Sequence, residues 1–162
     1  TGEALIGNEP FGVILADDLC YSENSSVMVQ MLKIYNKYKC SIVAIEEVSQ
    51  DMVENYGIID GNLIDNSKNI FRVNNMIEKP NHNDSPSNLA IIGRYILTPD
   101  IFNILRKIKP GISGEIQITD ALFEQCKQGN VIAYKFKGKR FDCGNIKGFL
   151  KATNYFANKL GI

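Results

Sequence analysis

Apolar residues follow two different spacings along this chain, and the longest unbroken run lies near its start. Residues 11–19, FGVILADDL, end in two adjacent carboxylates, Asp17 and Asp18. Continuous apolar runs are typical of strands covered on both faces, as in the middle of a parallel sheet. Because open α/β sheets bind ligands beyond the carboxyl ends of their strands, this run predicts a metal or ligand site at the two carboxylates. A cap at Asp18 and a solvated turn at Asp17 explain the stretch equally well.

Helical spacing, with apolar residues three or four positions apart, follows several residues that can cap a helix. Ser25 or Ser26 precedes the first such segment, Thr98 and a proline precede another, and Asn145 precedes the last; residues 115–128 form one more. Each segment predicts a helix with one buried face. The expected buried residues are Met28, Met31, Leu32 and Tyr35, then Ile101, Phe102, Leu105 and Ile108, then Ile118, Ala121, Leu122 and Cys126, and finally Phe149, Leu150, Phe156, Ala157 and Leu160.

Short segments rich in β-branched residues lie between these helices and predict strands. They cover residues 41–48, 70–73, 89–97 and 131–137. Residues 56–64, YGIIDGNLI, place Asp-Gly-Asn between apolar pairs, which favours a hairpin or tight turn. The alternation of strands and helices predicts a layered α/β fold, and the length suits one domain over residues 1–162.

Composition and charge exclude several classes of protein. Eighteen Lys and Arg balance eighteen Asp and Glu, so the net positive charge on which nucleic-acid binding depends is absent and no nucleic-acid partner is expected. The four cysteines form no CxxC pair, which argues against zinc and against a secreted disulfide framework and favours a cytoplasmic protein. No segment reaches the roughly 20 uninterrupted apolar residues that a membrane-spanning helix needs.

Three groups of polar residues stand at predicted element ends and could carry chemistry. They are Asp17-Asp18, Glu78-Lys79-Pro80 and Asp142-Cys143-Gly144. Two carboxylates that converge from distant strands could hold Mg²⁺, and a lysine beside them suits a phosphate. Taken singly, each group is also typical of a solvated loop or turn.

The only histidine, His82, lies in the polar segment 81–88, NHNDSPSN. This segment is rich in turn residues, so we expect an exposed loop over a site. No second histidine, cysteine or patterned carboxylate accompanies His82, and we expect no metal-binding or catalytic role for it.

Several of these motifs, in their order and spacing, resemble one family. FGVILADDL, YGII, IEKP, SNLAIIGRYILTP, GEIQITDAL and RFDCGNIKGFLKA together are similar to the bacterial UTP–glucose-1-phosphate uridylyltransferases, or UDP-glucose pyrophosphorylases. The resemblance covers nearly the whole chain. It implies a Rossmann-like mixed sheet layered with helices, of the type found in nucleotide-diphospho-sugar transferases.

The resemblance also implies roles for individual residues. Asp17 matches the first aspartate of the family's strand-end pair, a ligand of the catalytic Mg²⁺, and Asp142 matches the second metal ligand. Glu78 matches the acid that binds glucose hydroxyls. Lys79 matches the lysine that contacts the sugar phosphate.

Other matched positions take part less directly. Gly57 corresponds to a glycine whose backbone approaches the sugar, and Ile91 lies where the family contacts the sugar ring from a strand. Asp18, Asn88 and Glu115 fall inside matching motifs, and we expect supporting roles for them.

The implied reaction joins two small substrates, UTP and glucose-1-phosphate, in a homo-oligomeric enzyme. The family's glycine-rich loop, GxGTRxLPxTK, and its uracil-recognising region are absent from this sequence. We therefore expect the larger, C-terminal part of a nucleotidyltransferase catalytic domain, lacking the N-terminal strands and inactive by itself, with the strand at residues 11–16 exposed as an edge. Thymidylyl or another nucleotidyl transfer, and a noncatalytic sugar-phosphate-binding subunit, remain alternatives.

Overall fold

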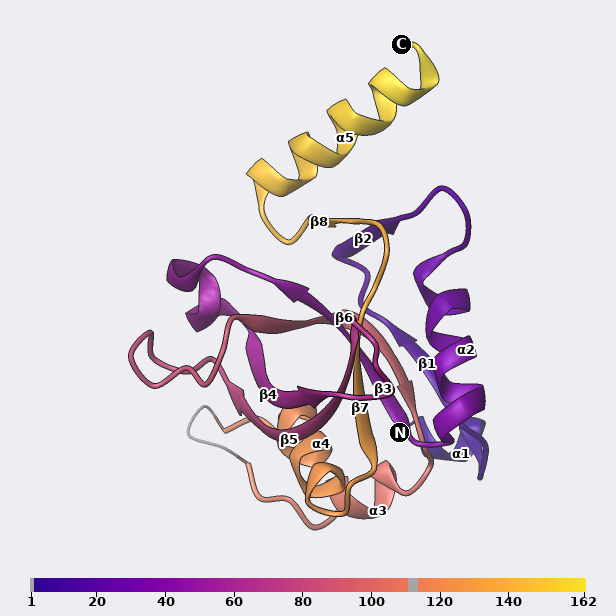
Figure 1. The fold of residues 1–162 in the computed structure, drawn as a ribbon, viewed down its shortest axis with the longest axis vertical. Helices are drawn as coiled ribbons and strands as arrows, with labels where there is room; N and C mark the ends of the chain where they lie inside the picture. Colours follow the sequence, from indigo (N-terminus) through magenta and orange to yellow (C-terminus); the bar gives the residue numbers. More distant parts are fainter. Residues whose placement is uncertain (1, 111–113) are drawn as a thin grey trace.

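A computed structural model describes residues 2–110 and 114–162 (Figure 1). Strands and helices alternate over much of the chain. In chain order the elements are α1 (Glu3–Ile6), β1 (Phe11–Ile14), β2 (Asp18–Tyr21), α2 (Val27–Tyr38), β3 (Ser41–Glu47), the 3₁₀ helix η1 (Gln50–Asn55), β4 (Gly57–Leu63), β5 (Ile70–Glu78), β6 (Leu89–Leu97), α3 (Ile101–Leu105), α4 (Ile118–Lys127), β7 (Val131–Lys135), β8 (Lys139–Asp142) and α5 (Ile146–Leu160).

Six strands form a mixed sheet in the order β1-β6-β3-β7-β5-β4. Strands β3 and β7 pair in parallel, and the other pairings within this sheet, as far as the structure describes it, are antiparallel. Strand β4 also pairs with the start of β6, so the sheet curls back on itself. The predicted α/β class with a mixed sheet is confirmed.

One edge of β6 is shared by two strands that do not meet. Its first residues pair with β4, with Ala90 opposite Ile58, while its last four pair with β1, from Arg94 opposite Ile14 onward. The other edge of β6 pairs with β3. Strands β1 and β4 therefore separate along β6 and leave a gap between them, which is where a sheet of this kind can admit a ligand.

Helices cover both faces of the sheet and close two apolar cores (Figure 1). Helix α2 packs on β3 and β6, and its Met31 is fully buried with Ile42 and Ile132. Helices α3 and α4 lie on the opposite face, where Leu122 is buried against Val43 in the other core. Ser26 caps α2 as predicted, because its hydroxyl accepts a hydrogen bond of 3.3 Å from the backbone of Val29.

A second unit rises from this body. Strands β2 and β8 form a separate two-stranded antiparallel sheet, and α5 extends away from it (Figure 1). Tyr21 and Phe141 contact Tyr155 and Phe156 in tilted or edge-to-face pairs, at ring-centroid distances of 5.1–6.0 Å, and these pairs attach α5 to the small sheet. Asn145 caps α5 as predicted, since its side chain accepts a bond of 2.8 Å from Gly148.

The strand predicted at residues 11–16, covered on both faces inside a parallel sheet, differs from the structure in two respects. The chain turns after Ile14 and begins a new strand at Asp18, and β1 is an antiparallel edge strand whose Gly12 and Ile14 are exposed. The turn is fixed by Arg94, whose guanidinium donates to the carbonyls of Leu15 and Asp18. An apolar run can thus supply one short strand and a turn. The expected exposure of residues 11–16 as a sheet edge agrees with the position of β1.

The predicted turn inside residues 56–64 is also wrong. Strand β4 continues through Asp60 and Gly61 and only bulges there against β5, and the chain reverses after Ile64. A Cβ at Gly61 would lie 2.7 Å from the carbonyl oxygen of Arg72. Glycine therefore serves a close approach between strands at this position.

Two of the predicted helix faces are corrected by the structure. In α2, Leu32 is exposed while Val27 and Gln30 are buried. In α5, the expected stripe is largely exposed, whereas Ala152 is the buried residue and Tyr155 and Phe156 are half-buried. The exposed members of that stripe are Phe149, Leu150 and Leu160, at 58%, 53% and 74%. Periodicity identified a face of α5 but not what would cover it.

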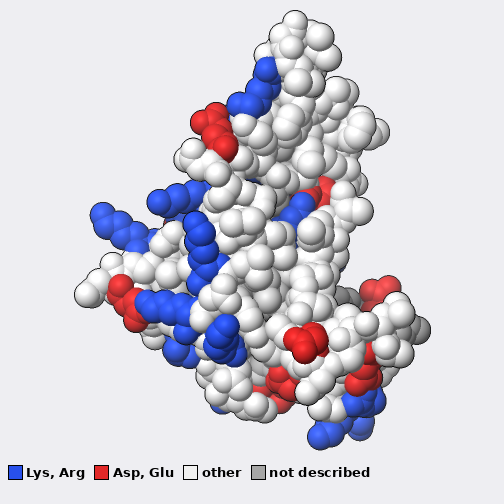
Figure 2. All heavy atoms as spheres, turned by 90° about the vertical axis from the view of Figure 1, so that its right-hand side faces the viewer, with Lys and Arg blue, Asp and Glu red and all other residues white. Residues whose placement is uncertain are grey.

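The surface carries charges of both signs. On the face that includes α2, separate groups of basic and acidic side chains lie among uncharged ones (Figure 2). None of the described helices is long and apolar enough to cross a membrane.

Candidate active site

A cleft of about 360 Å³ lies at the gap between β1 and β4. Residues from the β1–β2 turn, β4, β5, β6, β8 and the start of α4 line it. The residues singled out from the sequence that contribute to it are Asp17, Gly57, Glu78, Lys79, Ile91 and Asp142. All six predicted site residues therefore share one cavity, although their individual roles stay predictions.

Asp17 and Asp142 face the same point at one end of the cleft. A Cβ at Gly144 would lie 3.1 Å from Asp17 Oδ2 and 3.2 Å from Asp142 Oδ1, so this glycine leaves room between the two carboxylates. The backbone joins the two segments as well, because the N–H of Cys143 donates to the carbonyl of Asp17 at 2.7 Å. The β1–β2 turn and the end of β8 are thus held together by their own backbones.

Two convergent carboxylates fit a magnesium ion. Mg²⁺ usually takes one or two carboxylates and completes its shell with water and substrate phosphates. Among the described residues, no group of three or more His, Cys, Asp and Glu could hold a metal. Asp17 and Asp142 offer two hard oxygen ligands, and a metal held by them would need further ligands from water or a substrate phosphate.

A buried ion pair supports this acidic end. Asp18 and Arg140 bond directly, and their side chains are 7% and 8% exposed. The other oxygen of Asp18 accepts a bond of 2.5 Å from the N–H of Gly93 on β6. A Cβ at Gly93 would lie only 2.7 Å from that oxygen. Asp18 thus ties β2, β8 and β6 together, which is the supporting role expected for it.

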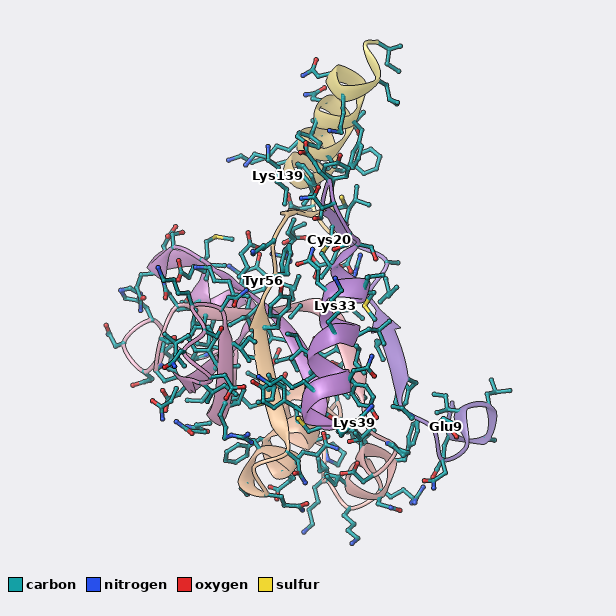
Figure 3. The ribbon with its side chains drawn as sticks, turned by 45° about the vertical axis from the view of Figure 1, so that its right-hand side comes forward. Glu9, Cys20, Lys33, Lys39, Tyr56 and Lys139 are labelled. Atoms are coloured by element: carbon teal, nitrogen blue, oxygen red, sulfur yellow. The ribbon has the colours of Figure 1, made fainter. Side chains whose placement is uncertain are left out.

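Tyr56 connects this ion pair to Asp142. Its hydroxyl donates to Asp142 Oδ2 at 3.1 Å and accepts from Arg140 Nη1 at 3.2 Å. Burial raises the pKa of Tyr56, although Arg140 acts in the opposite direction, so the phenol stays protonated as a donor at neutral pH. Figure 3 shows Tyr56 on the side of the main sheet that faces the small sheet, whose strands carry Cys20 and Lys139. We call Asp17, Asp18, Arg140 and Asp142 the charged wall of the cleft.

The opposite side of the cleft is built by close packing. A Cβ at Gly57 would lie 3.0 Å from Glu78 Oε2, 3.2 Å from Thr119 Oγ1 and 3.4 Å from Ile91 Cδ1. Thr119, in the first turn of α4, donates a hydrogen bond of 2.6 Å to Glu78 Oε2. We call Gly57, Glu78, Ile91 and Thr119 the packed wall. It is formed by β4, β5, β6 and α4.

Lys79 also lines the cleft, and its backbone conformation is unusual. Its φ of 46° is in the left-handed region, which costs a residue with a side chain roughly 1 kcal/mol or more. A bond of 3.0 Å from its N–H to the carbonyl of Tyr56 holds it there. Within residues 2–110 and 114–162, its ammonium forms no ion pair. The side chain is thus able to neutralise an anion in the cleft.

Tyr95 on β6 completes the floor of the cleft. Burial, together with the negative charges of Glu78 and Asp18, raises its pKa to about 12. Its hydroxyl therefore remains protonated through the physiological range.

Other candidates from the sequence lie elsewhere. Asn88 donates to the carbonyl of Val48, and neither it nor Glu115 lines the cleft. Residues 81–88 do not cover the cleft as expected, because His82 is bound to η1 through Glu54 and Gln50.

Sequence reasoning missed Tyr56, Arg140 and Thr119. Arg140 and Thr119 stand inside quoted motifs, RFDCG and GEIQITDAL, and Tyr56 directly precedes Gly57 in YGII. Their presence in these motifs was the signal by which the sequence could have identified them as residues of the site.

Comparisons with known proteins agree with this architecture. Residues 1–159 match the nucleotidyl transferase family. A UTP–glucose-1-phosphate uridylyltransferase of Pseudomonas aeruginosa strain PAO1 is 59% identical over 156 residues, which cover 96% of this chain and 55% of that protein. One of Staphylococcus epidermidis is 39% identical and is matched over 54% of its length. The chain spans about half the length of the curated relatives it matches.

A solved structure shows the same similarity to these enzymes. The crystal structure of a UDP-glucose pyrophosphorylase complexed with UDP-glucose superposes with a TM-score of 0.94 at 58% identity, covering 98% of this chain and 60% of that one. The resemblance that the sequence motifs indicated is therefore confirmed. From its fold, its sequence and its matched length, the chain belongs to the nucleotidyl transferase family.

Proposed function

We propose that the whole protein, of which this chain carries the cleft, transfers a uridylyl group from UTP to glucose-1-phosphate, giving UDP-glucose and pyrophosphate. One observation supports this above the others: acidic side chains, the lysine Lys79 and uncharged residues line a single cleft. The names and high identity of the relatives support this choice of substrates.

In the proposed reaction, a phosphate oxygen of glucose-1-phosphate attacks the α-phosphorus of UTP. The bond from this phosphorus to the β-phosphate oxygen breaks, and pyrophosphate leaves with that electron pair. The nucleophile is already an anion, so no general base is needed. Bringing two polyanions together is mainly a matter of position and charge neutralisation.

Each wall then has a separate task. Lys79, unpaired among the described residues, would hold the attacking phosphate. Asp17 and Asp142 would hold Mg²⁺, and a bound ion of this kind supplies charge neutralisation and orientation at the phosphates. On the packed wall, Glu78 would accept hydrogen bonds from sugar hydroxyls, Ile91 would contact the ring, and the missing side chain of Gly57 leaves space for both.

We further propose a cytoplasmic homo-oligomer. The four cysteines are free, as is usual in a reducing compartment. The outer edge of β1 has no strand partner among the described residues and could accept another chain.

The direct test is release of pyrophosphate by the whole protein from UTP, glucose-1-phosphate and Mg²⁺, with dTTP replacing UTP in a parallel reaction. We expect release with UTP and at most slow release with dTTP. Binding of glucose-1-phosphate without release from either nucleotide would overturn the proposal in favour of a noncatalytic sugar-phosphate-binding subunit. Faster release with dTTP would favour thymidylyl transfer.

A further inference from the structure

Glu78 has one oxygen that cannot take part freely in substrate binding. Oε2 accepts the 2.6 Å bond from Thr119, and it faces the position where a side chain on Gly57 would begin. The hydroxyl of Thr119 therefore restricts this oxygen, and the absence of a side chain at Gly57 leaves the space that the oxygen needs. The remaining lone pairs of the carboxylate are the ones available to the cleft.

The donor of that bond is itself firmly placed. Thr119 is 5% exposed and belongs to the buried face of α4, together with Ala121, Leu122 and Cys126. This face packs into the core on β5, the strand that ends in Glu78. The positions of the hydroxyl and the carboxylate are thus set by the same helix–strand contact.

From this geometry we propose that Thr119 is a positioning residue that fixes the carboxylate of Glu78 for recognition of sugar hydroxyls. This inference deepens the proposed function and rests on it as far as the sugar is concerned. A free glutamate side chain loses rotamer freedom when it binds a ligand. Thr119 removes much of that freedom before binding, so the carboxylate meets the sugar already oriented.

The orientation should affect selectivity as well as affinity. A carboxylate held in one orientation accepts hydrogen bonds from hydroxyls in one arrangement and leaves another arrangement poorly bonded. A mobile carboxylate could follow either arrangement. Removing the hydroxyl of Thr119 should therefore weaken discrimination between glucose-1-phosphate and galactose-1-phosphate, which differ in the orientation of one hydroxyl.

The matched variants are Thr119→Ser and Thr119→Ala, because they differ from each other only by the hydroxyl group. In the whole protein, we expect Thr119→Ala to raise the KM for glucose-1-phosphate about tenfold and to change the KM for UTP less than about twofold. Selectivity for glucose-1-phosphate over galactose-1-phosphate should fall. Thr119→Ser should restore both values to near those of the wild type.

A merely structural threonine would behave differently. Its loss would lower the thermal midpoint and change both KM values together, with equal effects of alanine and serine. Equal kinetics for wild type, Thr119→Ala and Thr119→Ser would also overturn the inference.

A crystal structure of Thr119→Ala separates this inference from the proposed function. Rotation or disorder of the Glu78 carboxylate in the variant is expected whatever the substrate is. An unchanged carboxylate would contradict the inference even in an active enzyme. Failure of the wild type to use UTP and glucose-1-phosphate would instead contradict the proposed function, while the structure of the variant would still decide the role of Thr119.

Discussion

The two walls of the cleft are built by different physical means. The packed wall rests on paired strands and a helix, and a Cβ added at Gly57 would lie only 3.0–3.4 Å from its side chains, so its shape depends on the space that glycine leaves. The charged wall lies on a turn and a two-stranded sheet, and hydrogen bonds among charged groups define it. A shape formed by packing is sensitive to added volume, whereas one formed by charges is sensitive to the loss of a partner.

The largest expected effect comes from removing Arg140. Arg140→Met leaves the carboxylate of Asp18 buried without its cation, which typically costs 3–5 kcal/mol. We expect the free energy of unfolding, measured with urea, to fall by about that amount. Lys139→Met is the control, because Lys139 is the exposed neighbour on β8. Equal unfolding midpoints for the two variants would show that the charged wall does not depend on the buried pair.

Asp142→Asn tests the same wall without removing a buried partner. The asparagine can still accept from Tyr56 but lacks the charge proposed for the metal. We expect kcat to fall about a hundredfold, corresponding to roughly 3 kcal/mol, with little change in thermal midpoint. Asp84→Asn, in the loop after β5, is the matched control. Near-normal kcat at saturating Mg²⁺ would remove Asp142 from the proposed metal site.

At these walls, the sequence identifies some of the functional residues, and only the structure identifies the residues that hold them in place. Residues at strand ends, such as Asp17, Glu78 and Asp142, could be found because motifs mark them locally. The partners that hold them could not, since Tyr56 bonds Asp142 across 86 positions of sequence. No local spacing encodes such a pair.

The fold shows the same division between local and distant information. Caps at Ser26 and Asn145 were predicted, because a cap bonds within three residues of itself. The apolar run that contains β1 predicts a strand in the interior of a sheet. Its pattern reports how apolar the strand is, but it does not report which strands lie beside it. The exposed Phe149 shows the same limit for a helix face.

Gly57→Ala tests the packed wall by adding volume. The new Cβ would lie 3.0 Å from Glu78 Oε2, and overpacking of this kind typically costs 1–3 kcal/mol. We expect weaker binding of glucose-1-phosphate in a calorimetric titration, with smaller effects on UTP. Gly2→Ala is the control, because its nearest neighbour outside the adjacent residues would be an ordinary 3.8 Å away. An unchanged dissociation constant would mean that the side chains of the packed wall move to make room for the added Cβ with no loss of binding free energy.

Lys79→Ala tests the lysine of the cleft, which belongs to neither wall. Loss of the ammonium should raise the KM for glucose-1-phosphate about tenfold while leaving the KM for UTP nearly unchanged. Lys79→Gly removes the same charge and also relieves the left-handed backbone at φ 46°. The glycine variant should therefore unfold at a higher temperature than the alanine variant, at equal KM. Equal effects of Lys79→Ala on both substrates would assign Lys79 a structural role.

The smallest effect on the fold is expected at β1, the strand that leads into the charged wall. The packed wall is backed by strands with neighbours, but the outer edge of β1 is unpaired in the part of the chain that the structure describes. Ile14 is 59% exposed, so Ile14→Lys should alter stability by less than about 0.5 kcal/mol. An apolar edge favours pairing with another chain, and a lysine opposes it.

Light scattering over a range of concentrations measures this association directly. The unchanged chain should form dimers or larger species, and Ile14→Lys should shift it toward the monomer. Leu160→Lys on α5 is the matched comparison, because Leu160 is 74% exposed but lies on the projecting helix. A stable monomer before any substitution would refute association through β1. A shift produced by Leu160→Lys alone would assign the contact to α5, and the charged wall would then be free of any interface at its strand.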